Sequence, residues 1–128
     1  MNNLLLLAAR VLIALVFLMT VWLGSPNAGY LGSLNLPMPE VMSWIARAAE
    51  ALIVLSLILG FATRYGALLG IAYVIVATAL AHRYWEYPAA QQLLQYTNFS
   101  KNLAILGGLI LVYVAGAGKL SVDNMRSN

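Results

Sequence analysis

The sequence from Leu4 to Leu23 decides the fold class, and it reads LLLLAARVLIALVFLMTVWL. A helix of about 20 mostly apolar residues is long enough to cross a bilayer. The run stops at the helix-breaking cluster Gly24-Ser25-Pro26-Asn27. A secretory signal normally begins with charged residues, which are missing here, and Arg10 interrupts the apolar stretch. We therefore expect a retained transmembrane helix.

Three further apolar runs follow, at about 41–62, 65–81 and 99–118. The first of them opens after Pro37-Met38-Pro39-Glu40, where proline and an acidic residue suit the first turn of a helix. The segment 89–96 is polar on one side and apolar on the other, which is typical of a helix at a membrane surface. The prediction is an all-α, single-domain bundle of four transmembrane helices over residues 1–128, with a short interfacial helix between spans three and four.

The composition supports a membrane environment. Hydrophobic residues make up 62% of the 128 residues and charged residues 9%, whereas soluble domains carry about 25% charged residues. The net charge of +3 is scattered along the chain, so it forms no basic face for nucleic acid. The chain has no cysteine, which excludes disulfides, thiolate nucleophiles and cysteine-ligated clusters.

The distribution of basic residues predicts the orientation. Four spans place both termini on one side of the membrane. That side collects Arg10, Arg64, Lys119 and Arg126, and the opposite side collects Arg47, Arg83 and Lys101. Because basic residues favour the cytoplasm, we expect both termini inside.

Small residues recur at helical spacing in the last two spans. Gly66 and Gly70 are four apart in the third span, and Ala104 and Gly108 are four apart in the fourth. Such pairs let membrane helices approach closely. They indicate packing within one bundle or, alternatively, a dimer interface.

Charged residues at membrane depth are the first candidates for a site, because burying a charge in the bilayer is costly. Glu50 lies about 14 Å along the second span, and Arg47 is one turn earlier on the same face. Glu50 is either neutralised by Arg47 or binds a ligand or a proton. Arg10 lies about 9 Å into the first span, where it either extends to the surface or forms a structural ion pair with Asp123.

His82 closes the third span and is the only histidine. A haem held by two histidines of this chain is therefore excluded, and we expect no metal site, because a single histidine is a weak ligand set. Aromatic residues surround it in the sequence, namely Tyr84, Trp85, Tyr87, Tyr96 and Phe99. They form either an aromatic belt at the membrane surface or the mouth of a pocket for a flat ligand such as a quinone ring.

Lys101 and Asn102 open the fourth span on the same membrane side as His82. If the four helices close into one bundle, the polar residues of this side converge in its outer half. The candidate ligand-binding set is Arg47, Glu50, His82, Trp85, Lys101 and Asn102, with Glu50 and His82 as candidate catalytic residues that handle protons.

Two stretches resemble the DoxX family. They are Asn98 to Gly108, NFSKNLAILGG, and Gly116 to Asp123, GAGKLSVD. Arg10, Glu50, the run LGFATR from Leu59 to Arg64, and His82 with Trp85 fit the same pattern. There are departures: Met19-Thr20-Val21-Trp22 stands where the family commonly has glycine and lysine, and Ala51-Leu52 replaces a common Gly-Gly.

The resemblance implies a small bacterial or archaeal inner-membrane protein. The family is named for the small subunit of a thiosulfate:quinone oxidoreductase. Since the chain has no flavin motif, haem ligand pair or cluster ligands, we expect a subunit of a quinone-linked redox complex rather than a self-sufficient enzyme. It would anchor a protein partner, or a second copy, and border a quinone site. The alternative is a structural or assembly protein, or a small-molecule binder or transporter, with no redox role.

Overall fold

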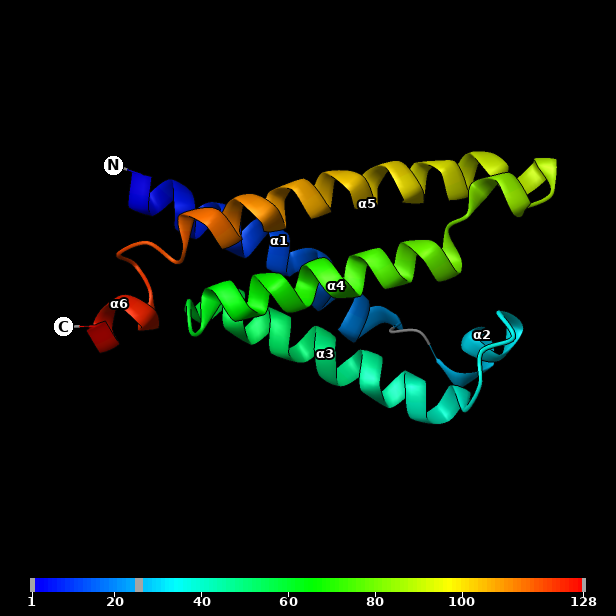
Figure 1. Cartoon of the computed structure of the whole chain (residues 1–128), viewed down its shortest axis with the longest axis horizontal. Coiled ribbons are helices and arrows are strands. Elements are labelled where there is room, and N and C mark those ends of the chain that lie inside the picture. The colour runs from blue at the N-terminus through cyan, green and yellow to red at the C-terminus, as the bar shows by residue number, and fades with distance from the viewer. Residues whose placement is uncertain (1, 25–26, 128) are drawn as a thin grey trace.

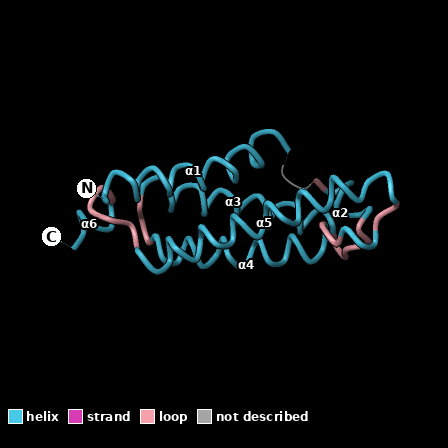
Figure 2. Tube along the Cα trace, turned by 90° about the horizontal axis from the view of Figure 1, so that it is seen from above, coloured by secondary structure: helices cyan, strands magenta, loops and turns pink. Residues whose placement is uncertain are grey.

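The computed structural model describes residues 2–24 and 27–127. Its long helices are α1 (Asn2–Gly24), α3 (Pro39–Leu59), α4 (Thr63–Ala81) and α5 (Ala89–Ala115), and its short ones are α2 (Ala28–Ser33), the 3₁₀ turn η1 (Tyr84–Glu86) and α6 (Val122–Ser127). Figure 1 shows the long helices running the length of an extended bundle, with both termini at one end. Figure 2 shows α6 near that terminal end and α2 toward the opposite end.

Within the described residues, four helices are long and apolar enough to cross a membrane, and they are α1, α3, α4 with its following turn, and α5. The all-α fold with four spans is therefore confirmed. Many large apolar side chains point outward, including Leu4, Leu52, Leu111 and Val114. Such a surface is suited to lipid rather than water.

The expected separate interfacial helix is corrected. The segment 89–96 is helical, but it is the beginning of α5, which continues without interruption to Ala115. No proline or glycine follows Pro88 until Gly107, so no helix-breaking residue interrupts the backbone hydrogen bonds there. The fourth span ends at Ala115 because Gly116 adopts a positive φ of 77°.

A small apolar core joins the helices. It is formed by buried side chains of α1, α3, α4 and α5: Ala14, Phe17, Ile53, Val54, Leu57, Ala67, Val74, Leu109 and Val112. A Cβ on Gly70 would lie 3.1 Å from Leu109, and one on Gly66 would overlap the Ser56 side chain. These two glycines therefore serve close packing of α4 on α3 and α5 within the monomer.

Candidate functional site

A buried carboxylate lies near the middle of α3. Glu50 is fully buried, and the Tyr73 hydroxyl on α4 donates a hydrogen bond to Glu50 Oε1. The Tyr73 ring packs edge-on against Phe17 of α1, with ring centroids 6.0 Å apart. The Tyr73–Glu50 pair thus joins α4 to α3 at the depth where α1 also closes the core.

A groove of about 320 Å³ lies beside this pair, between α2, α3 and α4. Its walls are apolar side chains and two tyrosines: Tyr30, Leu31, Leu34, Leu36, Met42, Ile45, Ala46, Ala49, Leu69, Ala72, Tyr73, Val76, Ala77, Leu80 and Ala81. Tyr73 lines the groove, and Glu50, which does not line it, accepts the hydrogen bond from the Tyr73 hydroxyl. The groove runs from mid-bundle to the end covered by α2.

Arg47 does not neutralise Glu50. Its guanidinium lies over the Trp44 ring, 5.7 Å from the ring centroid, in a small polar hollow with Glu40 and Ser43. The ion pair found in the described residues joins Arg83 to Glu86, at 3.2 Å. Glu50 instead accepts a hydrogen bond from a neutral phenol on the neighbouring helix, which a pattern of charges along one helix does not reveal.

The other predicted site residues lie around α4 and α5 at the end away from the termini. His82 Nδ1 is 2.7 Å from Gln95 Oε1, and Asn102 Nδ2 donates to Thr78 Oγ1 at 3.0 Å. Trp85 and Asn102 line a second groove of about 350 Å³, and Lys101 is exposed. The structure therefore brings Trp85 and Asn102 together but places Glu50 and Arg47 elsewhere.

The expected Arg10–Asp123 ion pair is replaced by hydrogen bonds to the backbone. The fully buried Arg10 donates from Nη1 to Leu57 O at 2.8 Å and from Nη2 to Leu120 O at 2.5 Å. Asp123 accepts from the Ala62 amide at 2.7 Å and the Thr63 amide at 2.9 Å. The reason is that helix ends leave carbonyls and amides without partners. The end of α3 and the Leu120 carbonyl in the loop before α6 therefore bind the cation, and the start of α4 binds the anion.

The environment of Asp123 favours its charged form. Partial burial opposes ionisation, but the amide hydrogen bonds from Thr63 and Ala62 and the charge of Arg126 outweigh it, so the pKa of Asp123 is below its usual value. The Asp123 amide also donates to Gly60 O at 2.8 Å. We call this set of contacts among Arg10, Leu57, Gly60, Ala62, Thr63, Leu120 and Asp123 the terminal clasp.

Tyr73 is the site residue that sequence reasoning missed. The available signal was a tyrosine ten residues after Thr63 and therefore about 15 Å along α4. A phenol at that depth requires a hydrogen-bond partner, and Glu50 on the neighbouring span lies at a similar depth.

Within the described ranges, no three histidine, aspartate or glutamate side chains gather as metal ligands would.

Comparison with known proteins identifies the family. The SURF4 family model matches residues 1–128. The chain belongs to the SURF4 family. It is 32% identical over 126 residues to the inner membrane protein YphA of Escherichia coli, covering 93% of this chain and 88% of YphA. It is 31% identical over 85 residues to the ER-derived vesicles protein ERV29 of Saccharomyces cerevisiae, covering 66% of this chain and 27% of ERV29. No solved structure matches.

These relationships correct the sequence-based identification. The assignment to the DoxX family was wrong, and so was the function of a quinone-linked redox subunit derived from it. The stretch GAGKLSVD carried that resemblance, yet it forms the loop after α5 and ends at Asp123, which caps α4. Those residues thus have a packing role in this chain. The expected location is confirmed: this is a multi-pass inner-membrane protein.

Proposed function

We propose that this protein is a membrane-embedded binding protein that takes the apolar chain of a lipophilic molecule into the groove between α2, α3 and α4. The observation that carries the proposal is the apolar groove whose wall includes Tyr73, oriented by the buried Glu50. Its volume of about 320 Å³ is at the lower end of the range of about 300–1,000 Å³ for small-molecule sites.

The lining supports a chain-like ligand. Ala49, Ala72 and Ala77 leave room between α3 and α4. Leu31 of α2 and the two leucines after that helix, Leu34 and Leu36, close the end of the groove. Among the residues that the structure describes, no charged side chain lines it, so a charged head group gains no ionic partner from them inside. A ligand's polar head then lies at the mouth near α2, where Tyr30 offers a partly exposed phenol.

The buried carboxylate fits this function as a positioning group. Keeping an acidic residue at mid-membrane is costly, and here it accepts the hydroxyl of the groove-lining tyrosine. The hydrogen bond fixes the ring plane that a bound chain would contact. If the pair only joins α3 to α4, loss of its hydrogen bond lowers stability without changing ligand binding.

The experiment is photolabelling with a long-chain fatty acid that carries a diazirine, performed on the purified full chain in detergent. Ala77→Phe fills the groove, and Ala48→Phe adds the same ring on the exposed side of α3. Labelled peptides from α3 and α4 should appear in wild type and Ala48→Phe but be lost in Ala77→Phe. Labelling that is unchanged in Ala77→Phe contradicts the proposal.

The proposal also includes an orientation with both termini in the cytoplasm. The terminal end carries Arg64, Lys119 and Arg126, and Arg10 bonds to the Leu120 carbonyl there. Basic residues favour the cytoplasmic side. A green fluorescent protein fused to the C-terminus should fluoresce, and a periplasm-dependent alkaline phosphatase fused there should be inactive. The reverse result places the termini outside.

A further inference from the structure

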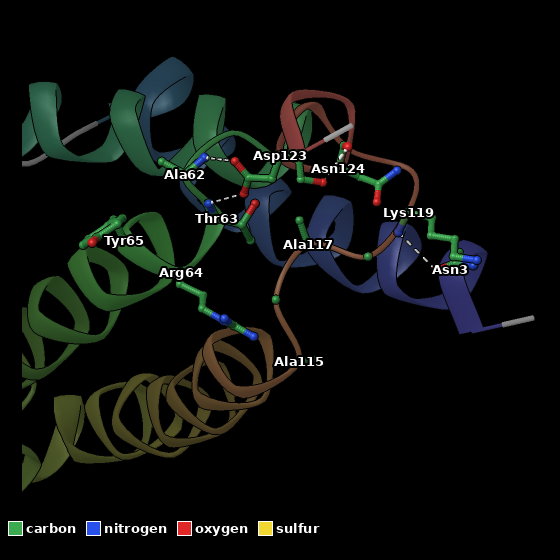
Figure 3. A pocket seen from close by; sticks show the side chains of 13 residues that line it. Asn3, Ala62, Thr63, Arg64, Tyr65, Ala115, Ala117, Lys119, Asp123 and Asn124 are labelled. Carbon is green, nitrogen blue, oxygen red and sulfur yellow. Dashed lines mark hydrogen bonds between the residues drawn. The ribbon is translucent and has the colours of Figure 1, made fainter.

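A polar pocket of about 550 Å³ lies at the terminal end, separate from the groove. Figure 3 shows that it is bounded by the start of α1, the start of α4, the loop after α5, and α6. Its polar side chains include Asn3, Arg64, Lys119, Asp123 and Asn124. Three regions far apart in the sequence, the start of α1, the start of α4 and the chain after α5, therefore contribute to one concave surface at the terminal end of the bundle.

Two basic side chains of this pocket have no carboxylate partner. The ion pair in the described residues is Arg83–Glu86, which leaves Arg64 and Lys119 unpaired by acids within that part of the chain. Arg64 is positioned by the end of α5: Nε donates to Tyr113 O at 3.1 Å and Nη2 to Val114 O at 3.4 Å.

Glycine at position 116 lets Arg64 lie flat against the loop. A Cβ there would be only 3.2 Å from Arg64 Nη2, and the φ of +77° favours glycine independently. The next residues of the loop, Ala117 and Gly118, line the pocket. Among the described residues, these two amides donate to no backbone carbonyl, so they are available as neutral donors.

The acidic residue of the pocket does not cancel these charges. Both oxygens of Asp123 accept amide hydrogen bonds from the start of α4. The positive end of the α4 dipole offsets part of the negative charge there. The lining as a whole carries two basic groups against one acidic group.

We propose that this pocket binds the phosphate group of an anionic molecule, with Arg64 and Lys119 as its cationic contacts and the Ala117–Gly118 loop as a source of amide donors. Arginine and lysine are the usual phosphate-binding side chains. Two sources share this chemistry: the head group of an anionic phospholipid and a soluble phosphate. Basic pockets between helices at the membrane face favour the phospholipid.

The test is native mass spectrometry of the full chain in detergent, with added phosphatidylglycerol or, at equal acyl composition, phosphatidylcholine. Wild type should retain phosphatidylglycerol preferentially. Lys119→Gln removes an exposed charge of the pocket and should lower that retention about five-fold. Lys101→Gln removes an equally exposed charge at the opposite end and should leave it unchanged.

A second arm distinguishes the two sources. Inorganic phosphate is titrated into wild type and Lys119→Gln and followed by isothermal calorimetry. Heat in wild type that is lost in Lys119→Gln, without selective retention of phosphatidylglycerol, identifies a soluble phosphate as the ligand. Equal behaviour of wild type and Lys119→Gln with both probes overturns the proposal. Arg64→Gln serves as an additional variant, used only where its melting temperature matches wild type, because Arg64 also caps α5.

Discussion

The two ends of the bundle are held together by different kinds of contact. At the terminal end, the clasp joins residues far apart in the chain: Arg10 bonds to carbonyls 47 and 110 positions away, and Asp123 bonds to amides about 60 positions away. Buried polar groups there find backbone partners at the end of α3 and the start of α4.

At the opposite end the polar contacts join residues closer in the chain, at most 24 positions apart for Asn102 and Thr78, and they leave open space. Tyr87 donates to Ala81 O six positions away at 2.7 Å, and Arg83 pairs with Glu86 one turn away. Both apolar grooves reach this end. The difference indicates that one end fixes the helices relative to one another, while the other has room for a ligand.

The largest effect is expected from Arg10→Met, which breaks the clasp. It removes two charge-assisted hydrogen bonds and leaves the Leu57 and Leu120 carbonyls without these donors. The free energy of unfolding should fall by about 3–5 kcal/mol, measured by denaturation in mixed micelles. The control is Arg83→Met in the exposed pair, which should cost less than about 1 kcal/mol. Equal losses would remove the distinction between the two ends.

Gly66→Ala tests the close approach of α4 to α3 near the clasp. The added Cβ would overlap the Ser56 side chain, which is held by a hydrogen bond to Phe61 O. Overpacking of this kind costs about 1–3 kcal/mol, seen as a lower melting temperature in detergent. Gly107→Ala is the matched control on α5, where a Cβ meets no heavy atom within 4 Å. An unchanged melting temperature in Gly66→Ala would mean that α3 and α4 are not in close contact at this position.

Tyr73→Phe probes the boundary between the fixed end and the open end. It removes a hydrogen-bond donor from the buried Glu50, at an expected cost of about 1–2 kcal/mol. It should also reduce photolabelling of the groove, because the Tyr73 ring is no longer held in position by the hydrogen bond to Glu50. Tyr65→Phe removes a hydroxyl from a side chain that is 78% exposed and should change neither quantity. If Tyr73→Phe behaves like Tyr65→Phe, the pair has no positioning role.

The smallest effect is expected from Asp123→Asn, at about 0.5–1 kcal/mol. Because the pKa of Asp123 in the folded protein is below the usual 3.8, its ionisation stabilises the fold above that pH. The contribution is lost as the pH falls through the lower folded value. Wild type should therefore lose more melting temperature than Asp123→Asn on acidification from neutral pH to below about 4. Parallel pH profiles would show that the carboxylate charge does not stabilise the clasp.

The spans were predictable from the sequence because hydropathy alone decides which segments enter a bilayer, and depth along a helix follows from residue number. The neighbouring helix that a side chain faces does not follow from hydropathy or from residue number. Arg47 and Glu50 share a predicted face of α3, yet Arg47 packs on Trp44 while Glu50 meets Tyr73 from α4. The expected convergence of polar residues in the outer half failed to appear for this reason.

The partners of Arg10 and Asp123 were unpredictable for a related reason. Charged side chains can be identified in a sequence, but the backbone carbonyls and amides that helix ends leave without hydrogen-bond partners cannot. The two residues do lie at the same end, as expected, yet each binds backbone groups rather than the other residue: Arg10 binds carbonyls of α3 and of the loop before α6, and Asp123 binds amides at the start of α4. The family resemblance failed where glycines and a capping aspartate, which serve packing, were read as marks of a redox protein.

The length of α5 has a consequence for how the protein sits in a membrane. Its 27 residues span about 40 Å, whereas the hydrocarbon layer is about 30 Å thick, and Figure 1 shows its beginning reaching past the end of α4. Such hydrophobic mismatch is relieved by tilting, by protrusion or by local thickening. Gln91 and Gln92 are exposed on the first turn of α5 and favour protrusion. This one helix therefore makes the vertical position of the whole bundle sensitive to bilayer thickness.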